Sequence, residues 1–212
     1  MMGAETKASI VLMALSHHGS EPFFLSLAIL LEVYVKIHDM TQVALMTAVI
    51  IILGLIPPIP LAFVPVPIVL QNLGIMIASI VLGPKRGTIA VGLFLLLALL
   101  GFPILSGGQA GPAVFVGPTA GYLIGWLLTP AFIASVNASA FMHHPGRQAV
   151  GTWIGAVLLV DILGSLWLII GSGMPWLPAV MANLAFIPGD TLKVAVAVIV
   201  GQRVRIPRIN RV

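Results

Sequence analysis

The sequence predicts an all-α integral membrane protein with six transmembrane helices and both termini in the cytoplasm. Of the 212 residues, 59% are hydrophobic and only 8% are charged, against about 25% charged in an ordinary soluble domain. Six acidic and ten basic side chains are too few to give such a chain a water-facing surface. Disorder is excluded as well, because it requires low hydrophobicity. The lipid bilayer is therefore the expected partner of the outer surface.

Six apolar segments supply the predicted helices, in runs close to the length that crosses a bilayer core of ~30 Å. They are residues 41–56, 68–82, 88–102, 118–136, 150–170 and 185–200. Several of these runs are short for a full crossing. We therefore expect the connecting loops to dip into the protein on one side.

The connecting segments alternate strictly in charge. Basic residues stand at Lys85-Arg86, at 143–147 and in the arginine-rich tail after 202, whereas 57–67, 103–117 and 171–188 contain no Lys or Arg. The positive-inside rule places the basic segments and both termini in the cytoplasm. Only an arrangement of six helices preserves this alternation. The arginine cluster fits a cytoplasmic tail better than a nucleic-acid surface.

Three regions follow from this organisation. Residues 40–206 form the membrane domain, 207–212 a basic cytoplasmic tail, and 1–39 an N-terminal extension of unknown role. The apolar run 23–35 is too short to span a bilayer. The extension is interpreted as dispensable or as an upstream start with Met40 as a natural alternative. Otherwise it is an amphipathic helix on the inner membrane surface.

Three ionisable residues lie within the predicted spans: Asp161, Asp190 and Lys193. Each costs roughly 2.5–3.5 kcal/mol at a helix centre and so needs a partner or a role. Asp190 and Lys193 share a helix face, and Pro188 suits a helix start, so we expect the pair near the outer end of the sixth helix. It is either an internal ion pair or a polar ligand site, and the neighbouring uncharged loops favour the ligand site. For Asp161 we favour a hydrogen-bonded core acid over a second ligand contact.

The segment Ser-Gly-Gly-Gln-Ala-Gly-Pro at 106–112 can bring backbone N–H groups and the Gln109 amide close to a ligand. Gly117, Gly121 and Gly125 have the spacing of a helix-packing motif, and Tyr122 beside them can point into a cavity. The chain has no cysteine, no His arrangement typical of a metal site and no phosphate-binding loop. We therefore expect no metal, no cofactor and no catalytic residue.

Four segments resemble the signature of a known family. They are Pro-Val-Pro-Ile-Val-Leu-Gln-Asn-Leu-Gly at 65–74, Leu-Gly-Pro-Lys-Arg-Gly at 82–87, Gly-Pro-Thr-Ala-Gly-Tyr-Leu at 117–123 and Ile-Pro-Gly-Asp-Thr-Leu-Lys at 187–193. They resemble the BioY family, the biotin-specific substrate-binding (S) component of energy-coupling-factor (ECF) transporters. The resemblance covers about residues 40–206.

This resemblance implies the ECF S-component fold in a prokaryotic plasma (inner) membrane, with a high-affinity biotin site near the outer face. It implies two kinds of partner: a transmembrane coupling (T) component and two ABC-type ATPase subunits. Asp190 and Lys193 fall on polar ligand positions, and Gln109 falls where family members carry Asn. Ala44 and Ala48 match the small-residue docking motif of the first helix.

Biotin fits these residue types. Asp190 can accept from a ureido N–H, Lys193 can donate to the ureido carbonyl or to the carboxylate, and Gln109 can do either. We expect Phe115 and Leu73 to cover the thioether ring. Gln71 and Tyr122 complete the expected set of substrate-binding residues.

Three other interpretations remain open at this point. The chain can be an S component for a different small vitamin, an intramembrane enzyme with Asp161 and Asp190 as paired acids, or a purely structural membrane subunit. The favoured prediction is a high-affinity biotin-binding subunit of an ECF-type ABC importer.

Overall fold

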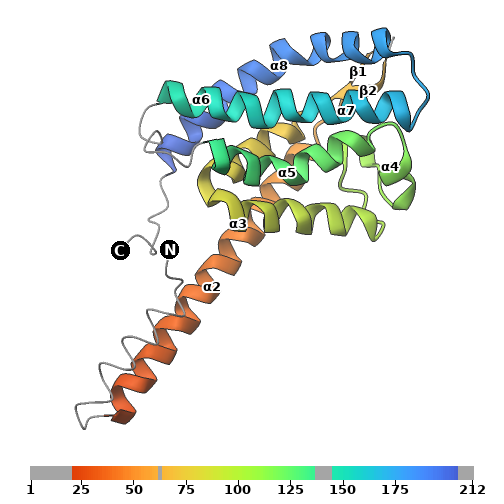
Figure 1. Cartoon of the computed structure of the whole chain (residues 1–212). Coiled ribbons are helices and arrows are strands. Elements are labelled where there is room, and N and C mark those ends of the chain that lie inside the picture. Colours follow the sequence, from red (N-terminus) through yellow and green to blue (C-terminus); the bar gives the residue numbers. More distant parts are fainter. Residues whose placement is uncertain (1–20, 62–63, 137–144, 205–212) are drawn as a thin grey trace. The chain divides into compact units, whose positions relative to one another are not determined.

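The computed structural model describes residues 21–61, 64–136 and 145–204, which are mainly helical (Figure 1). Contacts divide the chain into two units, residues 1–42 with 207–212 and residues 43–206, which we describe separately. Residues 1–20 of the predicted extension lie outside the described residues, as do the arginines at 205, 208 and 211.

The first helix, α2, runs from Glu21 to Gly54 and contributes to both units. The helix predicted at 41–56 is the C-terminal part of α2, so no helix boundary separates the predicted extension from the membrane domain. In the first unit, Thr41 Oγ1 donates to the Ile37 carbonyl at 2.9 Å, and the Gln42 amide lies 3.1 Å from His38 Nδ1. These contacts span one helical turn within α2.

Helix α3 (Gln71–Leu99) contains the second and third predicted helices, separated by a sharp reversal at Gly83. Gly83 has φ 76° and ψ −168°, a backbone conformation that side-chain-bearing residues rarely adopt. Proline follows it at position 84. The second half of α3 folds back on the first half. The close approach of Gly87 to Ala78 shows this, since a Cβ at Gly87 would lie 3.3 Å from the Ala78 carbonyl oxygen. The predicted break at Gly83-Pro84 is therefore present.

Helix α5 (Ala120–Val136) matches the fourth predicted helix. The fifth begins earlier than predicted and is built from α6 (Pro145–Trp153), a π-helical turn η2 (Ile154–Leu158) and α7 (Leu159–Ile170). The last helix, α8, runs from Trp176 to Arg203. Among the described residues, four helical stretches are long and apolar enough to cross a membrane, and α5 contains a shorter apolar one.

The start of α8 corrects the prediction that Pro188 begins the last helix. Pro188 lies inside α8, and the connection before the helix shrinks to a few residues after Ile170. A membrane helix tolerates an internal proline where neighbouring helices satisfy the freed backbone groups. Asp190 and Lys193 consequently lie near the middle of α8, and not at its end as predicted.

The segment predicted as the first outer loop forms a small antiparallel hairpin, which departs from the all-α prediction. Strand β1 (Ile59–Leu61) pairs with β2 (Val64–Ile68), with Ile59 opposite Ile68. Proline is tolerated in such short edge strands. The next uncharged segment contains the short helices η1 (Ser106–Gly108) and α4 (Pro112–Val116).

Two of the three spaced glycines on and before α5 serve helix packing. A Cβ at Gly121 would overlap the Leu163 carbonyl and Trp167 Cβ, and a Cβ at Gly125 would lie 3.0 Å from Val160 Cα. Both glycines therefore let α5 approach α7 closely, as predicted for small residues in membrane helices. A Cβ at Gly117, by contrast, would face the Ala113 carbonyl oxygen at 3.1 Å.

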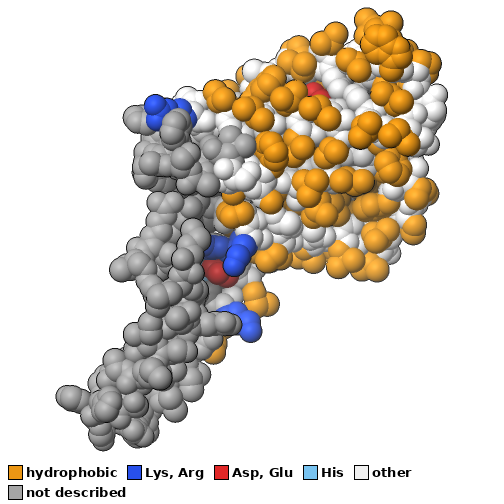
Figure 2. Space-filling view, in the orientation of Figure 1, with side chains coloured by type: hydrophobic (Ala, Val, Ile, Leu, Met, Phe, Trp, Pro, Cys, Tyr) orange, Lys and Arg blue, Asp and Glu red, His pale blue; other side chains and the backbone are white. Residues whose placement is uncertain are grey.

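Large apolar side chains cover the visible surface of the second unit (Figure 2). The turn of α3, the start of α6 and the end of α8 lie at one end of this unit (Figure 1). These segments carry Lys85-Arg86, Arg147 and Arg203. The β1–β2 hairpin, α4 and the start of α8 lie at the opposite end (Figure 1).

Candidate substrate-binding site

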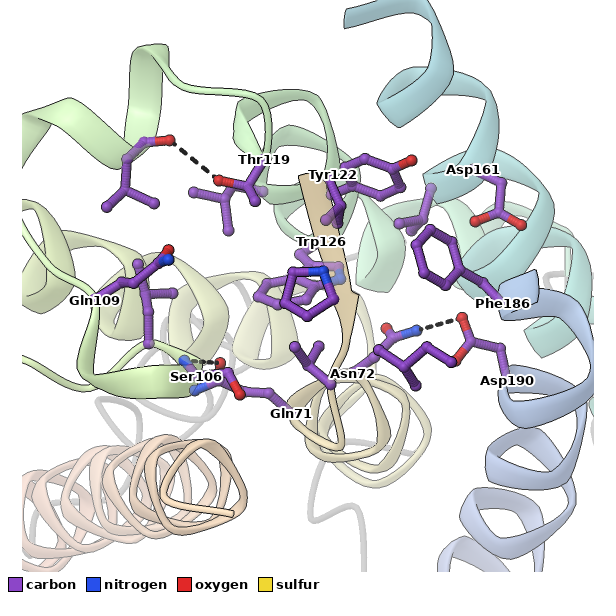
Figure 3. Close-up of a pocket in the computed structure, with 18 of the residues that line it drawn as sticks. Gln71, Asn72, Ser106, Gln109, Thr119, Tyr122, Trp126, Asp161, Phe186 and Asp190 are labelled. Atoms are coloured by element: carbon purple, nitrogen blue, oxygen red, sulfur yellow. Dashed lines mark hydrogen bonds between the residues drawn. The ribbon is translucent and has the colours of Figure 1, made fainter. Parts of the chain in front are cut away.

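A cavity lies inside the second unit, with an empty volume of about 690 Å³ including the part open to solvent. The lining comes from β2, α3, α4, α5, α7, α8 and the loop before α4. Its polar members are Gln71, Asn72, Ser106, Gln109, Thr119, Tyr122, Asp161, Asp190 and Lys193. The other lining side chains are apolar and include Trp126 and Phe186 (Figure 3).

The buried ion pair of α8 forms one wall of this cavity. Lys193 Nζ lies 2.6 Å from Asp190 Oδ1 and also donates to the Val69 carbonyl at 2.7 Å. Asn72 Nδ2 donates to Asp190 Oδ2 at 3.1 Å. The pair therefore links α8 to the start of α3. An ammonium group carries three N–H donors, so one donor of Lys193 remains for a ligand.

Gln71 holds the loop that borders the cavity in place. Its Nε2 donates to the carbonyls of Ile104 at 2.9 Å and Ile50 at 3.3 Å, and its Oε1 accepts from the Ser106 backbone N–H at 3.2 Å. The side chain is completely buried. Gly54 makes room for it, since a Cβ there would overlap Gln71 Nε2. The polar atoms of Gln71 thus join α2, α3 and the loop, and their bonds are made within the protein.

The loop residues Ser106 and Gln109 lie across the cavity from Asp161 and Asp190 (Figure 3). The Leu105 N–H donates to the Gln109 carbonyl at 3.2 Å, which closes a tight turn. Within it, η1 contains a non-helical glycine at position 107 with φ 77°, a left-handed conformation that suits glycine. Among the described residues, Ser106 Oγ is buried without a hydrogen-bond partner. It is therefore available to a ligand.

A polar network behind the cavity fixes Tyr122. The Tyr122 hydroxyl donates to Asn183 Oδ1 at 3.3 Å, and the same amide donates to Ser165 Oγ and to the Asp161 backbone carbonyl. The Tyr122 and Phe186 rings meet edge to face, with centroids 6.0 Å apart, a favoured aromatic geometry. Tyr122 therefore presents its ring to the cavity while its hydroxyl is bonded elsewhere.

Most of the residues predicted to bind substrate line this one cavity. Asp190, Lys193, Gln109, Tyr122 and Gln71 all do so.

Leu73 and Phe115 are not among the residues that line the cavity. Both are partly buried and pack against the apolar core. The neighbours Gln71 and Asn72 line the cavity instead of Leu73, because successive helical residues point about 100° apart.

Four side chains that line the cavity were not individually predicted to bind substrate: Asn72, Ser106, Trp126 and Phe186. Ser106 was included only through the backbone of the predicted loop 106–112. The position of Asn72 in the sequence could have indicated a polar site, because Gln71 and Asn72 are two adjacent amides at the start of an otherwise apolar run. Asn72 Oδ1 is buried without a hydrogen-bond partner among the described residues. No comparable signal marks Trp126 or Phe186, because aromatic residues are common in membrane helices.

The two small residues predicted to dock a partner, Ala44 and Ala48, are exposed on α2. They lie one turn apart and thus on one face of the helix. In the described part of the chain, no group of three His, Cys, Asp or Glu residues is placed to hold a metal ion.

Comparison with known proteins agrees with this arrangement. The model of the BioY family matches residues 27–208. The biotin transporter BioY of Lactococcus lactis subsp. cremoris is 46% identical over 174 residues, which is 80% of this chain and 92% of that protein. The biotin transporter BioY of Rhizobium etli is 41% identical over 176 residues, covering 80% of this chain and 94% of its own length.

A solved structure is similar as well. The S-component for biotin from an ECF-type ABC transporter superposes with a TM-score of 0.74 and is 45% identical. The match covers 79% of this chain and 90% of that one. Like these relatives, the chain is a multi-pass protein of a prokaryotic plasma membrane. From the match over most of its length, the chain belongs to the BioY family.

Proposed function

We propose that this chain is the high-affinity biotin-binding subunit of an ECF-type ABC importer. In this role it delivers biotin across the membrane together with a T component and ATPase subunits. The observation that carries the proposal is the cavity that contains the Asp190–Lys193 pair. The names of the similar proteins, biotin transporters and an S-component for biotin, support the choice of ligand.

The free hydrogen-bonding groups of the cavity suit biotin. Its ureido ring has two N–H donors and one carbonyl acceptor, its thioether ring is apolar, and its valerate tail is anionic. Asn72 Oδ1 and the remaining lone pairs of Asp190 are acceptors, whereas Lys193 and Ser106 supply donors. Trp126 and Phe186 supply apolar surface. A site built around specific polar groups rejects analogues that leave them unpaired.

We further infer six transmembrane helices with both termini in the cytoplasm. The two halves of α3 on either side of Gly83 supply two of the six. The turn of α3, the start of α6 and the end of α8, which carry the basic residues 85–86, 147 and 203, lie at one end of the second unit (Figure 1). This supports a cytoplasmic position for that end. A single cysteine placed at position 147 of this cysteine-free chain tests the topology. An impermeant reagent should fail to label it in intact cells and should label it in permeabilised ones.

Coupling to partner proteins is part of the proposal. The sequence contains no phosphate-binding loop of the ATPase type. The energy for transport is therefore expected to come from the ATPase subunits and to reach this chain through the T component. The exposed Ala44 and Ala48 on α2 offer the close backbone approach that small residues permit between membrane helices.

The chain is a transport protein and not an enzyme, since the similar proteins are named as transporters. These names therefore argue against Asp161 and Asp190 as a catalytic pair. The same names argue against a different vitamin as the ligand.

Equilibrium binding to detergent-purified protein tests the proposal. Labelled biotin should bind saturably, unlabelled biotin should displace it, and thiamine or riboflavin in large excess should not. Binding of thiamine or riboflavin in place of biotin would assign the chain to another vitamin. Absence of saturable binding would overturn the proposal.

A further inference from the structure

The Asp161 carboxyl differs from the other ionisable groups of the cavity in its lack of a bonding partner. It lines the cavity and is only 5% exposed, yet it has no hydrogen-bond or ion-pair partner among the described residues. Both oxygens of Asp190, by contrast, are bonded. The nearby Asn183 amide donates to the Asp161 backbone carbonyl and to Ser165, and not to the carboxyl. A buried carboxyl without a partner is costly and calls for a role.

The burial pattern places Asp161 on the inward face of the fifth helical stretch. Buried residues recur there at intervals of four from η2 into α7, as at Val157, Asp161 and Ser165. The π-helical turn η2 lies directly before this part of α7, and single π-helical turns are frequent at functional sites. Asp161 therefore faces the interior of the unit, where it lines the cavity.

Asp161 and Asp190 come from neighbouring helices, α7 and α8, with the Phe186 ring between them (Figure 3). The two carboxyl groups at this end outnumber the one ammonium group, that of Lys193, which disfavours the anionic tail of the ligand there. They suit N–H donors instead. Ser106 and Gln109 lie at the other end of the cavity (Figure 3), where a polar, uncharged loop is open to the tail.

We propose that Asp161 is a ligand-binding residue that accepts a hydrogen bond from the ureido ring of biotin. The ring then lies between α7 and α8, and the valerate tail extends toward Ser106 and Gln109. This inference rests on the proposed function, since it takes biotin as the ligand.

The test compares Asp161→Leu and Asp161→Asn with the wild-type protein, measuring biotin affinity and the thermal stability of the ligand-free protein. Asp161→Leu removes a buried carboxyl that has no partner, so the ligand-free protein should unfold at the same or a higher temperature. Its biotin affinity should fall by about tenfold to over a hundredfold. Asp161→Asn keeps an accepting oxygen and should lose less.

Thr152→Val is the matched control. Thr152 lies on the preceding helix α6, and its Oγ1 is likewise buried without a partner among the described residues, but the residue does not line the cavity. Its replacement should leave biotin affinity within about twofold of wild type while the stability is unchanged or higher.

Two ligand analogues locate the contact. An analogue methylated on both ureido nitrogens should bind the wild type and Asp161→Leu equally weakly. Biotinamide, with a neutral tail, should lose as much affinity in Asp161→Leu as biotin does. A much smaller loss for biotinamide would place Asp161 at the tail and overturn the proposal.

Two further results would refute the role of Asp161: wild-type affinity in Asp161→Leu, or a loss of affinity that parallels a loss of stability. Failure of the wild-type protein itself to bind biotin would instead overturn the proposed function. The two failures are therefore distinguishable.

Discussion

Removing both charges of the α8 pair separates a structural role from a ligand-binding role. The double variant Asp190→Leu with Lys193→Met replaces the 2.6 Å ion pair by apolar side chains of similar size. Such a replacement of a buried pair is often neutral or stabilising. Here it also leaves Asn72 Nδ2 without its acceptor, which costs about 1–3 kcal/mol. The double variant should therefore fold with modestly reduced stability.

The single variants should behave differently. Asp190→Leu alone leaves the Lys193 ammonium buried with only the Val69 carbonyl at 2.7 Å. Breaking a buried pair in this way costs about 3–5 kcal/mol, so this variant should be much less stable than the double one. The order of unfolding temperatures should be wild type, double variant, single variant.

Biotin affinity should fall in the double variant far more than stability does. Each lost charge-assisted hydrogen bond is worth about 1.5–3 kcal/mol, which corresponds to about tenfold to over a hundredfold in Kd. Asp190→Asn should cost less than Asp190→Ala, because the amide oxygen still accepts. Isothermal titration calorimetry in detergent measures the biotin affinity of each variant, and its unfolding temperature shows whether the variant is still folded. A folded double variant with wild-type affinity would refute the assignment and leave the pair structural.

Three further predictions test the cavity wall, the loop and the partner surface. A Cβ at Gly164 would overlap the Tyr122 ring, so Gly164→Ala should lower the stability by about 1–3 kcal/mol through overpacking and weaken biotin binding. The control Gly92→Ala, whose Cβ would meet its nearest neighbour at an ordinary 3.6 Å, should change neither stability nor binding. Gln71→Leu leaves the loop's buried backbone groups unpaired, at about 1–3 kcal/mol each. Faster biotin dissociation in stopped flow is expected from it, and an unchanged rate would show that Gln71 does not hold the loop. Ala44→Trp on the exposed face of α2 should abolish co-purification with the T component while biotin binding persists; an intact complex would place the interface elsewhere.

Composition and charge predicted much of the helical arrangement. Gly83-Pro84 marked a true reversal because only glycine readily adopts φ 76°. Proline at 188 misled the prediction for the opposite reason: in a membrane bundle, neighbouring helices satisfy the groups that proline frees, so the helix continues through it. The same tolerance hid the true start of α8 at Trp176 and shifted the ion pair to mid-helix.

The candidate site was predictable where it depends on charge and not where it depends on packing. Asp190 and Lys193 stood out because ionisable residues are rare within membrane spans. Asp161 stood out equally, but the sequence does not show whether its carboxyl faces a cavity or a bonding partner in the core, because that depends on how α7 packs against α5 and α8. Leu73 was predicted to line the cavity because it lies in the same sequence motif as Gln71. The rotation of the helix instead turns Asn72 toward the cavity.

Biotin is expected to occupy the cavity that contains the α8 pair, and a structure of the protein determined with saturating biotin would show whether it does. One biotin molecule should lie beside Asp190 and Lys193, enclosed by Trp126 and Phe186. Biotin bound anywhere else on the molecule, with this cavity empty, would contradict this expectation.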